Sequence, residues 1–116
     1  MRIVLIGADR EENLATRYLA AALRRAEHEA TLVGFSEAKD LERAVRTALA
    51  VGPDLIGLSI VFQRRAREFG ALAQALRAGG FGGHLTAGGH FPTFAHDALL
   101  AAHPAIDSVI RHEGAL

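Results

Sequence analysis

Residues 55–61, LIGLSIV, form a short and almost continuously apolar run that decides the fold class. Gly52-Pro53 ends the helical pattern before this run, and apolar residues at helical spacing resume at Ala66. A run of this length without polar alternation is typical of a strand buried on both faces of a parallel sheet. We therefore expect residues 55–61 to be a central strand, with helices packed on both sides of it.

The sequence on either side repeats this alternation of strand and helix. The other expected strands are residues 2–7, 29–35, 84–88 and 106–111, and the expected helices are residues 13–26, 41–51, 66–78 and about 94–102. Ser36 is a candidate cap for the second helix. Right-handed crossovers between such strands predict an α/β fold, a doubly wound five-stranded parallel sheet in the Rossmann-like or flavodoxin-like order 2-1-3-4-5, with helices on both faces.

Composition and charge narrow the class of protein. The 116 residues are enough for one domain, and 13 basic side chains balance 13 acidic ones. A neutral chain has no field that would favour a nucleic acid or an anionic membrane. The absence of cysteine excludes disulfides, thiolate zinc sites and iron–sulfur ligation within this chain. No run is apolar enough for a signal peptide or a membrane span, so we expect a soluble cytoplasmic domain spanning residues 1–116.

In an open parallel sheet, ligands bind outside the carboxyl ends of the strands. Gly88-Gly89 is the most informative pair at this edge, because two residues without Cβ atoms let a bulky ligand approach the backbone. A tight turn that needs positive φ explains the pair about equally well. Ser59 ends the central strand, where its hydroxyl can hydrogen-bond a ligand or cap the next helix, and capping is the better explanation of Ser59 alone.

Several familiar sites are excluded by what stands at this edge. A receiver domain needs Asp where this chain has Ser59 and Lys where it has His112. The first loop, residues 7–13, has neither a dinucleotide fingerprint nor a P-loop, nor the phosphate loop of a flavodoxin. The six histidines lack metal-ligand spacing, and no nucleophile–base pair can be assigned. We therefore assign no catalytic residue and no metal ligand.

Four segments together resemble the cobalamin-binding (B12-binding) domain found at the N-terminus of B12-dependent radical S-adenosylmethionine (SAM) enzymes. They are Glu12-Asn13-Leu14, the run DLIGLSIV at 54–61, the run GGHFPTF at 88–94 and the run IDSVIRHEG at 106–114. The last two are the most specific, and the resemblance spans essentially the whole chain. His112 is a departure, since the group usually has Gly there.

The resemblance implies cobalamin as the cofactor and a set of contact residues. These are Ala8, Asp9, Glu11, Asn13, Ser59, Val61, Phe62, Gly88, Gly89, His90, Phe91 and Glu113. Gly88 and Gly89 would give the nucleotide tail room, and Ser59 would hydrogen-bond it. Other cobalamin domains carry D-x-H-x-x-G, whose His binds cobalt from below. Glu11 stands at that His position, so we expect base-off cobalamin without a protein imidazole.

The resemblance also implies a partner. We expect the domain to present cobalamin to a radical SAM catalytic domain, in cis or in trans, most commonly for methyl transfer. The SAM and the 4Fe-4S cluster would belong to that domain, because a chain without cysteine cannot hold the cluster. This chain would then be an N-terminal piece of a longer enzyme and not a catalyst alone. A cofactor-free Rossmann-like interaction domain remains the alternative.

Overall fold

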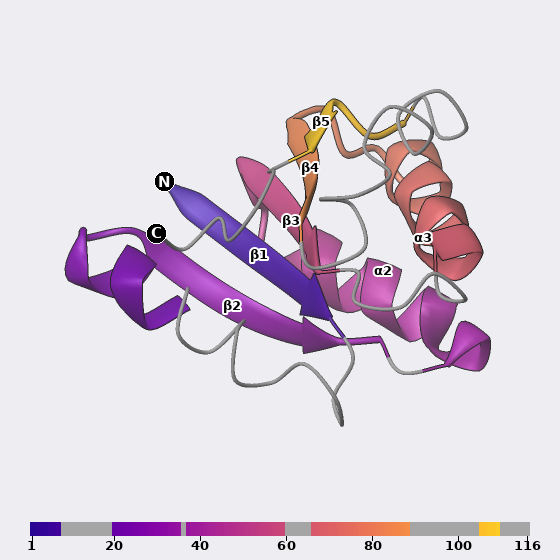
Figure 1. Cartoon of the computed structure of the whole chain (residues 1–116), viewed down its shortest axis with the longest axis horizontal. Helices are drawn as coiled ribbons and strands as arrows, with labels where there is room; N and C mark the ends of the chain where they lie inside the picture. Colours follow the sequence, from indigo (N-terminus) through magenta and orange to yellow (C-terminus); the bar gives the residue numbers. More distant parts are fainter. Residues whose placement is uncertain (8–19, 36, 60–65, 89–104, 110–116) are drawn as a thin grey trace.

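A parallel sheet organises the protein. The computed structural model describes residues 1–7, 20–35, 37–59, 66–88 and 105–109. The strands are β1 (Arg2–Gly7), β2 (Glu29–Gly34), β3 (Leu55–Ser59), β4 (His84–Gly88) and β5 (Ser108–Val109). They are ordered β2-β1-β3-β4-β5, and every pair of neighbours is parallel (Figure 1). All of their carboxyl ends therefore lie at one edge of the sheet.

The helices end within one residue of the predicted positions: at residue 25 instead of 26, at Ala50 instead of Val51, and at Ala78 as predicted. Residues 20–25 are helical, η1 (Ala38–Asp40) is a short 3-10 turn, and α2 (Leu41–Ala50) and α3 (Ala66–Ala78) are α-helices. After α3, Gly80 adopts a φ of 107°, and after α2, Gly52 adopts a φ of 68°. Because glycine tolerates positive φ without a steric penalty, these two positions end the helices and turn the chain back toward the sheet.

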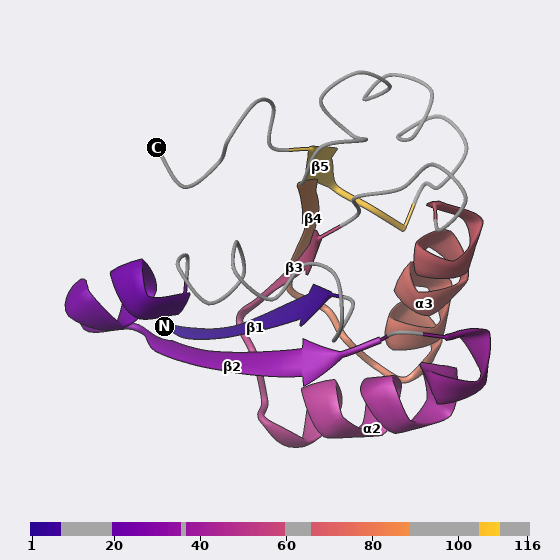
Figure 2. The same ribbon diagram turned by 60° about the horizontal axis from the view of Figure 1, so that its bottom comes forward.

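The larger part of the core lies between the sheet and the two long helices, which occupy the same side of it (Figure 2). Ala48 of α2 and Leu72 of α3 are fully buried against strand residues such as Ile56. Phe35, just after β2, packs edge-on against Phe69 of α3, with ring centroids 5.0 Å apart. This apolar burial is the main source of stability in the described part of the chain.

A smaller cluster covers part of the opposite face. Ile3 and Leu5 of β1 are buried there with Ala30 of β2, and Ala20 packs against them from the helical residues 20–25. Leu23 and Leu55 complete this cluster at its margin. Helical residues therefore lie on both faces of the sheet, as the alternation of strands and helices predicts.

The predicted α/β class and the strand order across β2, β1, β3 and β4 are confirmed. Two predicted strand boundaries are wrong: β2 ends at Gly34 and not at Phe35, and β5 begins at Ser108 and not at Ile106. Phe35 leaves the strand to fill the core against α3. The predicted cap Ser36, the predicted helix at 94–102 and the end of the last strand lie outside the described residues.

Candidate functional site

The carboxyl edge brings the ends of the strands together. Ser59 of β3 is paired in register with Gly88 of β4, and Gly7 of β1 with Gly34 of β2. The N–H of Phe35 donates to the carbonyl of Gly7 at 2.8 Å, which continues the pairing just past β2. A serine hydroxyl and three positions without side chains therefore lie along this edge, where open parallel sheets bind ligands.

Small and polar residues share the face of β3, β4 and β5 that points away from α2 and α3. We call this set the small-residue face; its members are Gly57, Ser59, Thr86, Gly88 and Ser108. Strand side chains alternate between faces, so the residues between them point the other way and build the larger core. From Gly57 to the carboxyl ends of β3 and β4, this face thus carries only small and polar side chains, whereas the other face carries the bulky apolar side chains of the larger core.

Gly57 is small for a packing reason. A Cβ atom at this position would lie 3.1 Å from Cδ2 of Leu5 and 3.9 Å from Cγ2 of Thr86. The side chains of the neighbouring strands therefore already occupy the space above Gly57. Ser59 and Gly88 form the part of the small-residue face nearest the carboxyl edge, where open parallel sheets bind ligands.

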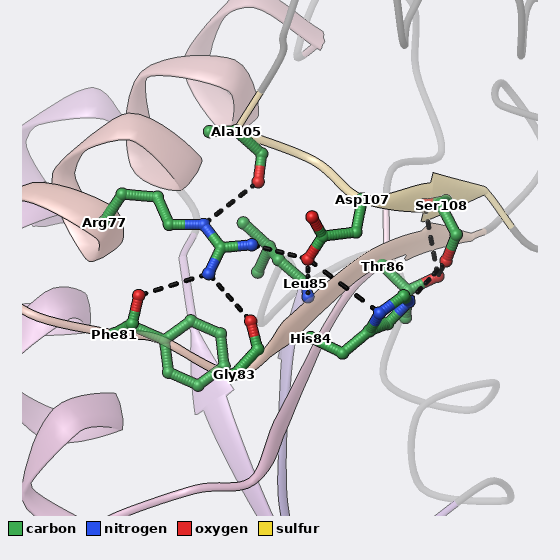
Figure 3. A network of polar contacts seen from close by, with 9 residues as sticks. All are labelled: Arg77, Phe81, Gly83, His84, Leu85, Thr86, Ala105, Asp107 and Ser108. Atoms are coloured by element: carbon green, nitrogen blue, oxygen red, sulfur yellow. Dashed lines mark hydrogen bonds and ion pairs between the residues drawn. The ribbon is translucent and has the colours of Figure 1, made fainter.

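Hydroxyl groups link β4 to β5 lower on this face (Figure 3). Thr86 is the buried polar residue among those described, and its hydroxyl donates to the carbonyl of Ser108 at 3.2 Å. The Ser108 hydroxyl lies 2.8 Å from the Thr86 hydroxyl and 2.8 Å from Nε2 of His84. These contacts satisfy polar groups that would otherwise be costly to bury.

An ion pair between Arg77 of α3 and Asp107, the residue before β5, lies where β4 begins. The carboxylate of Asp107 accepts hydrogen bonds from the N–H of Leu85 at 2.8 Å and from Nη2 of Arg77 at 2.5 Å. The bond from Leu85 is the main reason that the pKa of Asp107 is lowered, and the Arg77 guanidinium lowers this pKa further, while partial burial opposes both. Asp107 is therefore held in its ionised form.

Two of the predicted site residues are described, and the structure brings them together as the Ser59–Gly88 pair. The others lie outside the described residues: Ala8, Asp9, Glu11, Asn13, Val61, Phe62, Gly89, His90, Phe91 and Glu113. Their roles stay predictions. In sequence they follow the strand ends that the structure places at the carboxyl edge.

Sequence reasoning assigned no role to Arg77, Thr86, Asp107 or Ser108. One signal was present, because a basic residue in the last turn of a helix often hydrogen-bonds carbonyl groups near the helix end. Arg77 occupies such a place, two residues before Gly79-Gly80. No sequence pattern indicated that its partner would be Asp107, which is 30 residues away.

Neither the acidic and histidine side chains nor the open hollow in the described residues marks a catalytic or metal centre. No group of three or more His, Cys, Asp or Glu side chains in the described segments could hold a metal ion. An open hollow lined by Arg77, Gly82, Gly83, His84 and Asp107 lies where β4 begins, at the opposite edge of the sheet from Ser59 and Gly88. The carboxyl edge remains the candidate site.

The strand order, the helices on both faces and the edge at Ser59 and Gly88 define a ligand-binding domain of the flavodoxin-like α/β class. The family model of the B12 binding domain matches residues 6–116, so the chain belongs to the B12-binding domain family. This membership supports cobalamin as its ligand. No functionally curated protein matches the sequence.

Solved structures show the same fold. A cobalamin-binding protein from Desulfitobacterium hafniense DCB-2 aligns with a TM-score of 0.76 and 17% identity, over 97% of this chain and 53% of that one. The cobalamin-dependent S-adenosylmethionine radical enzyme OxsB aligns with a TM-score of 0.75 and 19% identity, over 98% of this chain and 17% of the enzyme. This chain thus spans about half of the first protein and a minor part of the second.

A response regulator from Burkholderia multivorans is also similar, with a TM-score of 0.58 and 19% identity over 97% of this chain and 83% of that one. The likeness is one of fold, since Ser59 stands where a receiver domain needs an aspartate. Among the helices that the structure describes, none is long and apolar enough to cross a membrane.

Proposed function

We propose that this chain is a cobalamin-binding module that holds its cofactor at the carboxyl edge of the sheet and presents it to a radical SAM catalytic domain. The observation that carries the proposal is the pairing of Ser59 with Gly88 at that edge. The family match over residues 6–116 supports cobalamin as the ligand. Residues 1–116 would then be one cobalamin-binding domain.

The residues of the edge fit this ligand chemically. Cobalamin combines a broad corrin ring with a nucleotide tail, and the tail needs both space and hydrogen bonds. Gly88 has no Cβ atom, so a ligand can approach the backbone of β4, and the neighbouring hydroxyl of Ser59 can donate or accept a hydrogen bond. We expect the tail to lie over the small-residue face and the corrin to lie over the strand ends.

Cobalamin supplies a cobalt centre that can carry a methyl group, whereas the chain supplies binding and orientation. The similarity to OxsB supports a radical SAM partner, because OxsB is a cobalamin-dependent SAM radical enzyme. The alignment covers 17% of that enzyme, so most of it lies outside the aligned region. We propose the same division here, with the SAM and the 4Fe-4S cluster in a separate domain and methyl transfer as the reaction.

The lower side of the corrin is a separate part of the proposal. Glu11 stands where related domains carry the cobalt-binding His, so we expect base-off cobalamin without a protein imidazole. Electron paramagnetic resonance of the Co(II) form tests this. Nitrogen superhyperfine splitting would contradict it, and loss of that splitting in His90→Ala would identify His90 as the ligand.

Binding itself is tested by incubating the purified chain with hydroxocobalamin and passing it through a desalting column. The protein fraction should carry the absorption spectrum of the cofactor in an amount equal to the protein. A colourless protein fraction at millimolar cofactor would favour the alternative, a cofactor-free Rossmann-like interaction domain. The family match does not favour that alternative.

A further inference from the structure

Arg77 connects three segments that are separate in sequence. Its Nη1 donates to the carbonyls of Phe81 and Gly83 at 3.1 and 2.7 Å, and its Nε donates to the carbonyl of Ala105 at 3.2 Å. Its Nη2 donates to the carboxylate of Asp107 (Figure 3). One side chain on α3 therefore ties the loop before β4 to the segment that leads into β5.

Asp107 takes the place of a strand partner for Leu85. Its N–H donates to the carbonyl of Leu85 at 2.7 Å, while its carboxylate accepts from the N–H of the same residue at 2.8 Å. Both backbone groups of Leu85 on this side are thus satisfied by Asp107 alone. Because Asp107 bonds Leu85 partly through its side chain, regular strand pairing, and with it β5, begins only at the next residue, Ser108.

The register of β5 depends on these contacts. β5 is two residues long and pairs Ser108 with Thr86 and Val109 with Ala87 at the edge of the described sheet. So short a strand contributes few ladder hydrogen bonds of its own. A slip by one residue would move every side chain to the other face, which would take the Ser108 hydroxyl away from Thr86.

We propose that Arg77 and Asp107 are positioning residues for the cofactor site: they fix β5 against β4 and so hold Ser108 on the small-residue face beneath the nucleotide tail. This inference rests on the proposed function, since it concerns the same site. The pair lies outside the set of residues that would touch cobalamin. It acts through Ser108, two residues along the strands from the Ser59–Gly88 pair.

The test compares two corrinoids, cobalamin and cobinamide, which has the corrin ring but no nucleotide tail. Dissociation constants for both are measured by absorbance titration, with folding checked by circular dichroism. Asp107→Asn keeps the shape of the side chain and removes its charge. We expect it to weaken cobalamin binding about tenfold, the loss of roughly one hydrogen bond, and cobinamide binding less than about twofold.

Glu29→Gln is the matched control. It removes a carboxylate from the other edge strand, β2, where Glu29 forms an exposed ion pair with Arg2 at 3.1 Å. It should leave both dissociation constants unchanged. An exposed ion pair contributes little to the stability of the fold, and this one lies far from Ser108.

Ser108→Ala keeps the proposal testable if Asp107→Asn does not fold, because it removes only the hydroxyl. It should show the same selective loss of cobalamin affinity. Unchanged affinity in both variants, or equal weakening for the two corrinoids, would overturn the positioning role while leaving cobalamin binding in place. A wild-type chain that binds neither corrinoid would instead remove the proposed function, and this inference with it.

Discussion

Ser59 of β3 and Gly88 of β4 lie side by side in register at the carboxyl edge of the sheet. Ser59 contributes a hydroxyl, and Gly88 contributes a backbone without a side chain. Because β3 is the middle strand of the described sheet, this pair sits at the centre of the edge and not at its margin. A large ligand centred on this pair would also reach the end of β1, the other neighbour of β3.

Substitutions in this pair should affect binding in different ways. Ser59→Ala removes one hydrogen bond and should weaken cobalamin binding about tenfold. Gly88→Val places a branched side chain on the small-residue face and should abolish measurable binding. Gly82→Val is the control, since nothing lies within 4 Å of a Cβ at Gly82 and this residue lies at the amino edge, just before β4. Absorbance titration gives the constants; wild-type affinity in Gly88→Val would move the site elsewhere.

Cobalamin should stabilise the folded chain. A ligand that binds the native state alone raises the free energy of unfolding by RT ln(1 + [L]/Kd), about 2.7 kcal/mol at a hundredfold excess over Kd. Thermal unfolding with and without hydroxocobalamin measures this gain. The gain should disappear in Gly88→Val, and an equal gain in that variant would indicate binding away from Gly88.

Two adjacent glycines should respond oppositely to alanine. A Cβ at Gly83 would overlap the carbonyl oxygen of Asp54 and lie 2.9 Å from the ring of Phe81, so Gly83→Ala should lower the free energy of unfolding by about 1–3 kcal/mol. Gly82 has open space and no positive φ, so Gly82→Ala should be neutral or stabilise the fold by up to about 1 kcal/mol. Urea denaturation of both variants decides; similar midpoints would show that the close contact at Gly83 does not exist.

The larger core should dominate stability. Leu72 of α3 is fully buried, so Leu72→Ala leaves a cavity and should cost about 2–5 kcal/mol. Leu32 on the edge strand β2 is 38% exposed, so Leu32→Ala should cost well under about 2 kcal/mol. Equal losses in urea denaturation would contradict the packing of α3 on the sheet.

The Asp107 carboxylate should make stability depend on pH in the acid range. Its pKa is lowered in the folded state, first by the hydrogen bond from Leu85 and then by Arg77. A lowered pKa means that the ionised group stabilises the fold above its ordinary pKa of 3.8 and that this contribution is lost as the pH falls below that value. The difference in stability between wild type and Asp107→Asn should therefore be largest near neutral pH and shrink in acid. A difference that grows in acid would contradict the ionised state.

The fold was predictable because two patterns are visible in the local sequence: continuous apolar runs in the strands and apolar residues at helical spacing in the helices. Residues 55–61 are apolar without alternation, and β3 indeed lies in the middle of the sheet. The start of β5 was not predictable, because it depends on Asp107 using its side chain in place of a backbone partner. A contact between Arg77 and Asp107 leaves no trace in local sequence, since propensity and period describe neighbours along the chain and not partners 30 residues apart.

The site was predictable in part for the same reason. The carboxyl ends of parallel strands lie at one edge of the sheet. Ser59 and Gly88 end two of the predicted strands, so both were expected at that edge. That they would be direct neighbours followed only from the order that places β3 beside β4. Which hydroxyls lie beneath them, at Thr86 and Ser108, required the register of β5 as well.

The most direct test of cobalamin binding at the carboxyl edge is an NMR titration of the isotope-labelled chain with hydroxocobalamin, following the backbone amides at the carboxyl and amino edges of the sheet. Binding at the carboxyl edge should give a one-to-one complex in which the amides of Ser59 and Gly88 shift most, while those of Asp54 and Gly82 at the amino edge stay nearly unchanged. No shifts at saturating cofactor, or the largest shifts at Asp54 and Gly82, would contradict binding at the carboxyl edge.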